Sequence, residues 1–415
     1  MNKENNKPRL RFPAFKGEWE ETTLGTVANK INRKNSHLEV SRVLTNSANV
    51  GVVDQNDYFD RDIAVKDNTA SYHIVELEDF VYNPRISTAA PVGPISINKI
   101  GRGIMSPLYT VFRFHTGYTP FYEQYFQTTI WHSYLKSIAN FGARYDRMNI
   151  TTEGFFNMPL TIPTPAEQEK IAACLSEIDK LIVTQGQKVD AIKDKKLGLM
   201  QQLFPRPGEN APRYRFPGFE DEWEEIKMSD VFTRKTDKNS ENNKNVLTIS
   251  AQYGLISQLD FFKKSVSASD VTGYYLLHKG DFAYNKSSSQ GRPVGAIKPL
   301  KLYDKGVVST LYICFRCKDP NAIDFWEQYF DAGIFDKEIM SIAQEGARNH
   351  GLLNVPTNDF FGLTVKKPVN PLEQQKIAEC LSSLDDLISF ESAKLDSLKD
   401  HKKGLMQQLF PQSGK

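Results

Sequence analysis

Two polar segments rich in hydrogen-bonding and cationic side chains occur in each half of this 415-residue chain. The first pair is 83–88 and 285–292, each directly after an aromatic strand-like run and ahead of a Pro-Val-Gly turn; the second pair is 142–147 and 346–350. Arg and Lys can bind guanine, Asn and Gln can bind adenine, and Ser or Thr can reach a base edge or a phosphate. These segments therefore predict DNA contacts. The predicted contact residues are Arg85, Ser87, Thr88, Arg102, Arg144, Tyr145, Arg147, Lys286, Ser288, Gln290, Arg292, Arg348, Asn349 and His350.

Each segment taken alone is also compatible with an ordinary solvated loop, and Tyr82 and Tyr284 beside the first pair are expected in the core. The overall charge does not decide the matter, because the formal net charge is only +2 with 25% charged residues. Basic residues nevertheless gather in two blocks. Residues 85–147 hold seven basic and two acidic side chains, and residues 286–318 hold seven basic and one acidic. Recurrence at the same place in both halves favours nucleic-acid contact over a solvated loop.

Motifs for catalysis were sought and not found. The sequence has no Gly-x-x-x-x-Gly-Lys-Ser/Thr phosphate loop and no Gly-x-Gly-x-x-Gly, and Asn83-Pro84-Arg85-Ile86 lacks the second proline and the aromatic residue of an amino-methyltransferase motif. Cys314 and Cys317 form a lone Cys-x-x-Cys without a second Cys or His pair, and the alternation around them indicates a strand. The sequence therefore predicts no catalytic residue, no metal site and no cofactor held by this chain.

Length and composition place the protein in a broad class. A chain of 415 residues is long enough for two or three domains, and its four cysteines fit a reducing compartment better than a disulfide framework. Residues 1–11 lack the apolar core of a signal peptide, and no apolar run approaches the roughly 18 residues that span a bilayer. We therefore expect a cytoplasmic protein.

The chain contains an internal repeat with a period of about 204 residues. Residues 8–21 return as 212–225, and residues 165–205 match 371–411 at about 25 of 41 positions without a gap. In each copy a segment with short aromatic and β-branched runs precedes a helix-like segment. The predicted fold class is α+β (mixed α/β), tandem-duplicated. The predicted parts are a mixed segment at 1–164, a long helix at 165–205, a linker at 206–211, a mixed segment at 212–370 and a second long helix at 371–411.

The boundaries of the two helices have local signals. Thr164-Pro165-Ala166-Glu167 and Asn370-Pro371-Leu372-Glu373 each place a cap residue before Pro at the first helical position and Glu at the third, which predicts a capping box. Pro205 and Pro411 predict where the helices end.

Both helices carry an apolar stripe with a 3.5-residue period. The stripe comprises Ile171, Leu175, Ile178, Ile182, Val189 and Ile192 in the first helix and Ile377, Leu381, Leu384, Ile388, Leu395 and Leu398 in the second. Polar residues interrupt it at matching positions, Gln185 and Lys196 in one helix and Glu391 and Lys402 in the other. This spacing is typical of a coiled-coil seam and predicts an antiparallel pair with a pseudo-twofold relation between the copies. The alternative is two amphipathic helices, each buried on its own domain.

The repeated phrase Pro-x-Glu-Gln-x-Lys-Ile-Ala-x-Cys-Leu-Ser-x-x-Asp-x-Leu-Ile, followed by Lys-x-Gly-Leu-Met-Gln-Gln-Leu-Phe-Pro, closely resembles the specificity subunits of type I restriction-modification systems. The resemblance covers the whole chain and the order of its parts. It implies that 1–164 and 212–370 are target-recognition domains, each reading half of a bipartite double-stranded DNA target, and that the target is asymmetric because the two domains differ.

The resemblance also implies a non-catalytic chain with partners. Two modification subunits would carry S-adenosylmethionine and methylate adenine, and restriction subunits would use ATP and magnesium for translocation and cleavage. The helices and the neighbouring surfaces would dock the modification subunits. Two alternatives from other classes stay open: a tandem-duplicated enzyme with an unrecognised active site, and a bivalent protein scaffold.

Overall fold

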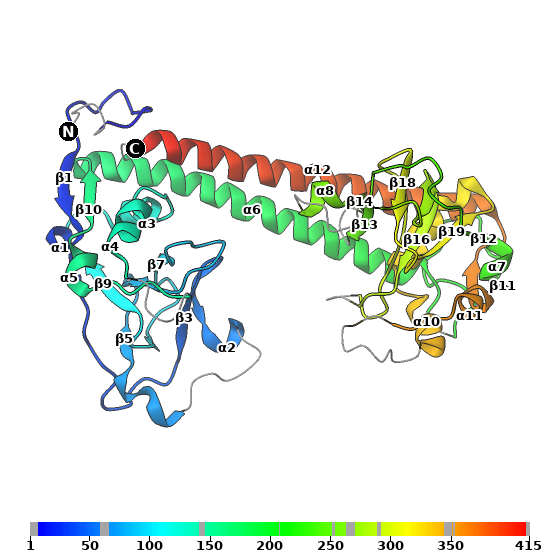
Figure 1. The fold of residues 1–415 in the computed structure, drawn as a ribbon, viewed down its shortest axis with the longest axis horizontal. Coiled ribbons are helices and arrows are strands. Elements are labelled where there is room, and N and C mark those ends of the chain that lie inside the picture. Colours follow the sequence, from blue (N-terminus) through cyan, green and yellow to red (C-terminus); the bar gives the residue numbers. More distant parts are fainter. Residues whose placement is uncertain are drawn as a thin grey trace. The chain divides into compact units, whose positions relative to one another are not determined.

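The computed structural model describes residues 7–58, 66–140, 146–206, 208–250, 254–262, 270–288, 292–343, 351 and 353–411. They belong to two compact units, with residues 1–185 and 394–415 in unit 1 and residues 186–393 in unit 2. Each unit contains parts of two long helices, α6 (Pro165–Leu203) and α12 (Pro371–Leu409), which Figure 1 shows running side by side. The rest of unit 1 is called head 1 and the rest of unit 2 head 2.

Head 1 is built on a four-stranded antiparallel sheet in the order β2-β9-β6-β7, with three further antiparallel pairs, β1-β10, β3-β4 and β5-β8. Its strands are β1 (Glu20–Thr23), β2 (Ala28–Lys30), β3 (Leu44–Ser47), β4 (Gly51–Asp54), β5 (His73–Val75), β6 (Phe80–Tyr82), β7 (Ile95–Ile97), β8 (Gly103–Met105), β9 (Thr110–Phe114) and β10 (Pro159–Ile162). Its helices are α1 (Leu24–Val27), α2 (Gln55–Tyr58), α3 (Thr119–Phe126), α4 (His132–Ile138) and α5 (Thr152–Phe156), with a 3₁₀ helix at Lys66–Ser71.

Head 2 repeats this plan, with the sheet β12-β19-β16-β17 and the pairs β11-β20, β13-β14 and β15-β18. Its strands are β11 (Glu224–Lys227), β12 (Phe232–Lys235), β13 (Leu247–Ser250), β14 (Gly254–Ser257), β15 (Tyr275–His278), β16 (Asp281–Asn285), β17 (Ala296–Pro299), β18 (Lys305–Val308), β19 (Ile313–Cys317) and β20 (Thr364–Lys367). Its helices are α7 (Met228–Val231), α8 (Gln258–Phe262), α9 (Ile323–Asp331), α10 (Asp336–Ile342) and α11 (Thr357–Gly362), with a 3₁₀ helix at Pro320–Ala322. The predicted mixed α/β class is confirmed.

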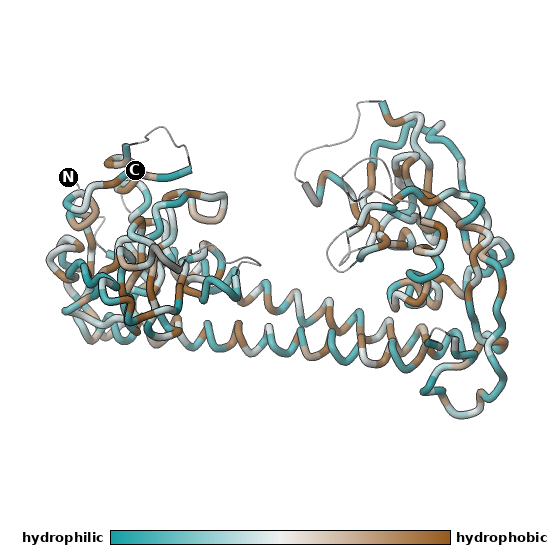
Figure 2. Tube along the Cα trace, turned by 90° about the horizontal axis from the view of Figure 1, so that it is seen from below, coloured by the Kyte–Doolittle hydropathy of each residue, from teal (hydrophilic) through white to brown (hydrophobic). Residues whose placement is uncertain are grey.

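The central strands are buried on both faces, which explains their continuous apolar sequence. In β6, Phe80 and Tyr82 join the large core against the helices, whereas Val81 joins a smaller core on the other face of the sheet. In β16, Phe282 and Ala283 divide in the same way. Figure 2 shows the hydrophobic residues gathered inside each head. Tyr82 and Tyr284 are core residues, as expected, and each hydroxyl donates to a backbone carbonyl.

The two long helices pair antiparallel along the predicted seam. In unit 1 the beginning of α6 lies beside the end of α12, and in unit 2 the end of α6 lies beside the beginning of α12 (Figure 1). All of the predicted apolar seam positions are buried or half-buried. The alternation of hydrophobic and hydrophilic residues along both helices is visible in Figure 2. The predicted coiled-coil pairing is therefore confirmed, and the alternative of two separate amphipathic helices is not what the structure has.

The lysines that interrupt the seam have acidic partners. In unit 1, Lys402 donates to Asp179 at 2.6 Å and to Gln127 of head 1 at 2.7 Å. In unit 2, Lys196 donates to Asp385 at 2.6 Å, and Asp385 also accepts from Gln328 of head 2. Each buried ammonium group is thus compensated within its own unit, and each network connects the helix pair to a head.

The last turn of each long helix packs into a head rather than kinking away at Gly198 or Gly404. In unit 1, Phe410 lies 5.5 Å from the ring centroid of Phe121 and 6.4 Å from that of Trp19. In unit 2, Phe204 lies 5.8 Å from Phe325 and 6.2 Å from Trp223. Each head core is completed by the end of the long helix that belongs to the other copy of the repeat.

In the first turn of each long helix, the glutamate side chain pairs with an arginine instead of forming the predicted capping box. Glu167 accepts two hydrogen bonds from Arg11, at 2.8 and 2.7 Å, and Glu373 accepts the same two from Arg215. Both carboxylates are only 1% exposed. The repeated Arg of residues 8–21 and 212–225 therefore ties the start of each copy to the start of its own long helix.

Candidate nucleic-acid interface

The first predicted loop of each head is shaped by an asparagine and a glycine. Asn83 follows β6, is buried, and donates from its side chain to the carbonyl of Asn46 at 2.9 Å. Gly93 has φ +79°, and a Cβ there would lie 2.0 Å from the carbonyl oxygen of Asn83. Gly295 stands in the same relation to Asn285, with φ +88°. The Pro-Val-Gly turn therefore needs glycine, because the backbone closes on itself at this point.

Backbone hydrogen bonds join the two predicted loops of head 1, and in head 2 they join the first predicted loop to the described residues that follow 346–350. In head 1 the amide of Ile86 donates to the carbonyl of Asp146, and that of Met148 donates to Pro84, both at 3.0 Å. In head 2, Ser288 donates to Gly351 at 2.7 Å, and Leu353 donates to the carbonyl of Lys286 at 3.0 Å. Segments about 60 residues apart in sequence thus form one composite edge in each head.

In head 1, this composite edge contains Arg85, Ser87, Thr88 and Arg147. Arg85 and Thr88 are exposed, and Arg85 has no ion pair among the residues that the structure describes. The Ser87 hydroxyl accepts the Ala90 amide at 3.1 Å and closes the turn. Arg147 is half-buried, lies opposite Arg85 in an antiparallel bridge, and its Nε has no hydrogen-bond partner in the described part of the chain. Arg144 and Tyr145 lie outside the described residues.

Arg102 is not at this edge. Its guanidinium pairs with Glu39 at 3.1 Å and with Glu76 at 3.2 Å. The backbone amide of Glu76 donates to Asp79, which immediately precedes β6, whereas Arg85 follows the other end of that strand. The structure therefore separates Arg102 from the other predicted contacts by the length of β6.

In head 2, the composite edge contains Lys286 and Ser288. Lys286 is half-buried and Ser288 is exposed. Arg292 points elsewhere, because its guanidinium donates to the Asp331 carboxylate at 3.1 Å and to its carbonyl at 3.4 Å. The remaining predicted contacts, Gln290, Arg348, Asn349 and His350, lie outside the described residues.

Much of the local positive charge counted in the sequence is neutralised by residues from other segments. Arg113 pairs with Asp79 at 2.7 Å, and its counterpart Arg316 pairs with Asp281 at 2.6 Å. Lys305 pairs with Glu241 at 2.7 Å. Burial disfavours the charged ammonium of Lys298 and by itself lowers its pKa, but the carboxylates of Asp331 and Glu327 outweigh this effect, so that the pKa of Lys298 is raised. Charge counted over a sequence window therefore overstates the free charge of the folded head.

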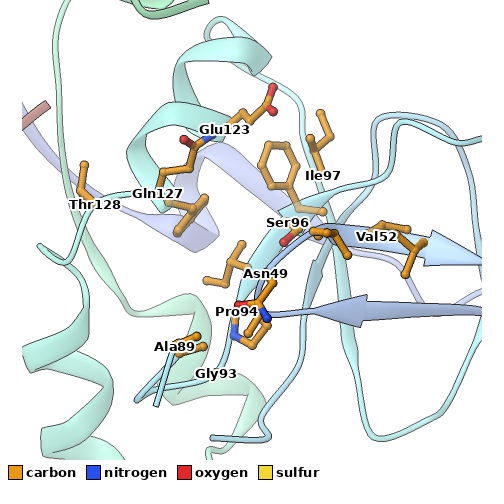
Figure 3. Close-up of a pocket in the computed structure, with 18 of the residues that line it drawn as sticks. Asn49, Val52, Ala89, Gly93, Pro94, Ser96, Ile97, Glu123, Gln127 and Thr128 are labelled. Carbon is orange, nitrogen blue, oxygen red and sulfur yellow. The ribbon is translucent and has the colours of Figure 1, made fainter. Parts of the chain in front are cut away.

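Head 1 also contains a groove that the sequence did not predict. Its volume is about 750 Å³, and it lies between the β3–β4 hairpin, β7 and the segment that follows α3. Figure 3 shows Asn49, Ser96 and Gln127 around it, one from each of these segments. Ala89 and Ala90, which directly follow the predicted loop 83–88, also line it.

The counterpart place in head 2 is described only in part, because residues 251–253 and 289–291 lie outside the described residues. The counterparts of the lining residues, Arg292, Ala296, Ile297, Phe330, Phe335 and Asp336 among them, surround a space of only about 10 Å³. Where head 1 has Ala90, Ser96 and Gln127, head 2 has Arg292, Lys298 and Asp331. Asp331 accepts from Lys298 at 2.5 Å and from Arg292 at 3.1 Å. Aligning the two copies would have revealed this difference, because three positions change together from uncharged to charged.

No metal site or membrane span emerges from the residues that the structure describes. These residues contain no group of three or more His, Cys, Asp or Glu arranged to hold an ion. Cys314 and Cys317 are buried residues of β19, and burial raises the pKa of their thiols to about 12 and about 11. In the same described part of the chain, no helix is both long and apolar enough to cross a bilayer.

No protein-family model matches the chain. The type I restriction enzyme MjaVIII specificity subunit of Methanocaldococcus jannaschii is 26% identical over 280 residues, covering 61% of this chain and 62% of that protein. The chain thus spans less than two thirds of the length of this curated relative.

Two solved structures are similar over nearly the whole chain. One is the S subunit of a type I restriction-modification system from M. genitalium, with a TM-score of 0.55, 12% identity, and coverage of 98% of this chain and 100% of that one. The other comes from work on the complex assembly and conformational transition of a type I R-M system, with a TM-score of 0.53, 12% identity, and coverage of 94% and 97%. The resemblance stated from the sequence is thereby confirmed: this chain is similar in sequence to a type I restriction enzyme specificity subunit and has the fold of a type I S subunit.

Proposed function

We propose that this chain is the DNA-recognition subunit of a type I restriction-modification complex and that each head reads one half of an asymmetric bipartite target. The observation that carries the proposal is the match of fold over 98% of the chain to an S subunit, together with two heads that share a frame and differ in their loops. Because the heads differ in sequence, two unlike half-sites follow.

The composite edges are the proposed DNA-contacting surfaces. Arg85 and Arg147 in head 1 and Lys286 and Ser288 in head 2 lie at edges whose first loop is held by an asparagine side chain, the buried Asn83 or the half-buried Asn285. A rigid loop positions a side chain for base readout better than a free one. The cations at these edges suit phosphate or guanine, and the hydroxyls suit a base edge or a phosphate. Arg85 has no ion pair among the described residues, and the Arg147 guanidinium has only a partner at 3.9 Å, Asp146.

The outer faces of the long helices are proposed to dock modification subunits. Phe390 is 69% exposed in α12, and Leu387 one turn earlier is exposed as well. In α6, Leu181 and Val183 are also exposed. Large apolar side chains on the solvent side of a long helix are unusual in a protein that works alone and suit a partner interface. The partners would supply S-adenosylmethionine-dependent adenine methylation and ATP- and magnesium-dependent cleavage, while this chain holds no cofactor.

The decisive test is adenine methylation mapped across the genome in cells with and without the gene. A bipartite, asymmetric methylated motif should disappear with the gene. The purified chain with DNA, S-adenosylmethionine, ATP and magnesium should neither methylate nor cut. Turnover by the pure chain would favour the tandem-enzyme alternative, and unchanged methylation with no salt-dependent DNA affinity would favour the protein scaffold.

Point variants test the proposed edges. In the assembled complex, Ala at Arg85 or Lys286 should either weaken binding to all sequences or, for a base contact, cost about 1 to 3 kcal/mol and relax one position of the motif. Arg102→Ala is the matched control, because Arg102 is paired with Glu39 and Glu76 away from the edge. Equal effects of Arg85→Ala and Arg102→Ala would contradict the proposed surface.

Exchanging the two heads on an unchanged pair of helices tests the division of labour. The order of the two half-sites in the methylated motif should reverse, while the bases read in each half-site stay the same. A motif that keeps its order would show that the heads do not carry the specificity.

A further inference from the structure

A leucine is exposed at the same turn of both heads. Leu108 lies between β8 and β9 and is 51% exposed, and Leu311 lies between β18 and β19 and is 60% exposed. One exposed leucine is ordinary on a protein surface. These two, however, occupy matching positions of the repeat, each two residues after a serine and directly before a tyrosine. Both copies thus keep a large apolar side chain in contact with solvent at this turn.

Each turn is fixed by hydrogen bonds to its serine and tyrosine. In head 1 the Ser106 carbonyl accepts the Tyr109 amide at 3.0 Å, and the Ser106 hydroxyl accepts the Leu108 amide at 3.4 Å. The Tyr109 hydroxyl lies 3.1 Å from that of Thr45, and the tyrosine packs against the smaller core of the head. Head 2 repeats these contacts with Ser309, Leu311, Tyr312 and Thr248. The leucine is therefore held on a fixed turn, as a side chain that contacts a ligand requires.

The strand register places both turns at the proposed DNA-contacting edges. The start of β9 pairs with the end of β6, and the start of β19 pairs with the end of β16. Leu108 precedes β9 by two residues, and Arg85 follows β6 by three. Leu311 likewise precedes β19 by two residues, and Lys286 directly follows β16. In each head the exposed leucine and the predicted cation thus lie at the same end of the central sheet.

The residues around the leucine indicate which part of a duplex it suits. Residues 103–112 and 306–315 contain no charged side chain, so that neither turn attracts or repels a phosphate through a charge of its own. An isobutyl group cannot bind a phosphate. At a DNA surface, such apolar groups contact a thymine methyl group or enter between two base steps.

The comparison of the two heads favours the base step. The polar residues of the edges differ, since Arg85 in head 1 has Ser287 as its counterpart in head 2, whereas the leucine is the same. Because the proposed half-sites are unlike, a residue that both heads share suits a contact that does not depend on base sequence. A thymine methyl contact requires one particular base, whereas insertion between stacked bases does not.

We propose that Leu108 and Leu311 are apolar wedges, each of which enters between two adjacent base pairs of its half-site and bends the duplex. The proposal rests on the proposed function, from which it takes the bound DNA and the edges that face it. Opening a base step costs free energy, and the contacts that a bent duplex makes with the protein offset this cost. Loss of a wedge should therefore weaken binding of every sequence and leave the preferred bases unchanged.

The first test measures affinity and the methylated motif. The probe is a duplex that contains the motif mapped by adenine methylation, bound by the assembled complex. Leu108→Ala and Leu311→Ala should each weaken binding about tenfold, as the loss of a leucine's apolar contact implies, and the motif methylated in cells should keep all of its positions. Because both side chains are exposed, the midpoint of thermal unfolding should stay unchanged.

Two other leucines of similar exposure provide matched controls. Leu77 is 54% exposed and lies before β6, and Leu302 is 62% exposed. The Leu300 amide donates to the carbonyl of Asp281, the first residue of β16, which places Leu302 near that end of the strand. Both controls thus lie at the end of the sheet opposite to the proposed DNA edge. Leu77→Ala and Leu302→Ala should leave the affinity for DNA unchanged.

A nicked duplex separates a wedge from an apolar contact on the outside of the DNA. A single-strand nick lowers the cost of opening a base step, so a nick at one step of each half-site should tighten binding by the wild type severalfold. At the head 1 half-site this gain should be lost in Leu108→Ala and kept in Leu108→Phe, because phenylalanine also serves as a wedge. A fluorophore pair at the duplex ends should report a bend of at least about 20° that decreases in Leu108→Ala.

Unchanged affinity in Leu108→Ala and Leu311→Ala, or an equal loss in the control variants, would overturn the proposal. Relaxation of a single motif position would also overturn it, because that result indicates a thymine methyl contact. A nick that gives no gain, or a gain that the alanine variants keep, would show that the leucines do not open a base step. Failure of the proposed function differs from these outcomes, because the methylated motif would then not depend on the gene.

Discussion

Head 1 and head 2 differ most at one place within a frame that is otherwise repeated. Both heads hold the loop after the central strand with an Asn-to-Gly contact, and both fix the start of that strand with an Asp–Arg pair, Asp79 with Arg113 and Asp281 with Arg316. Beside this frame head 1 has a groove lined by uncharged Ala90 and Ser96, whereas in head 2 the counterparts of these two residues, Arg292 and Lys298, form ion pairs with Asp331. Duplication has thus kept the residues that set the backbone and changed those that line a surface.

The difference also shows how a fold tolerates variation in its working surface. The carboxylates of the frame, Asp79 and Asp281, are buried, so that loss of their partners is costly, whereas the residues at Ala90, Ser96 and Gln127 differ from their head 2 counterparts within the same strand order. Heads that differ in this way can read different ligands on one scaffold.

The largest expected effect concerns a contact that the two heads share. Arg11→Ala and Arg215→Ala should each lower the free energy of unfolding of their own unit by about 3 to 5 kcal/mol, because each leaves a carboxylate that is 1% exposed without its partner. Urea unfolding with hydrogen–deuterium exchange to locate the affected unit measures this. The double variant Arg11→Met with Glu167→Leu should recover most of the loss. A large effect in only one unit would show that the Arg–Glu pair does not contribute equally to the stability of the two units.

A smaller effect should appear only in head 2. Lys298→Ala removes one of the two cations that hold Asp331 and should cost about 2 kcal/mol, the value of a hydrogen bond to a charged group, while the matched change Ser96→Ala in head 1 should cost less than about 0.5 kcal/mol. The same unfolding measurement decides it. If the two changes cost the same, the ion cluster does not stabilise head 2.

The general plan could be predicted from the sequence because it depends on local and periodic signals. Pro165 and Pro371 mark the helix starts, and the 3.5-residue stripe with matching polar interruptions specifies the pair. The apolar runs of the central strands and the Pro-Val-Gly turns predicted that each half contains a mixed segment with β-strands.

The candidate site was harder to predict from the sequence, because it depends on contacts between distant segments. Charge counted in a window could not show that Arg102 is neutralised by Glu39 or that Arg292 is held by Asp331, since the acids come from other parts of the chain. The backbone hydrogen bonds that join loop 83–88 to Asp146 and Met148, and loop 285–288 to Gly351 and Leu353, have no side-chain signature either. The groove is lined in part by Ala90, Ser96 and Gln127. None of these residues indicates a groove by itself, and the difference between the heads is seen only when they are compared with their counterparts in head 2, Arg292, Lys298 and Asp331.

The smallest expected effect concerns pH. A fall in pH should change the free energy of unfolding in opposite directions in the two heads. His132 begins α4, and burial with help from Lys136 lowers its pKa to about 4, so its imidazole takes up a proton more readily in the unfolded chain. Its contribution to stability is present above pH 6.5 and is lost as the pH falls towards 4. Asp336 begins α10 at the matching place, and burial raises the pKa of its carboxyl, although Arg292 opposes the rise. Its contribution is greatest below its ordinary pKa of 3.8 and is lost as the pH rises through the folded-state value.

Substitution of these two residues separates their contributions from all other titrations. Unfolding free energies between pH 4 and 7 should fall less steeply with decreasing pH for His132→Gln than for the wild type. Asp336→Asn should change the pH dependence of unit 2 in the opposite direction. Because His132 and Asp336 occupy counterpart positions, opposite slopes would mean that the two heads differ in electrostatics at this place. Parallel pH profiles for His132→Gln and the wild type would instead show that the imidazole is as accessible to protons in the folded head as in the unfolded chain.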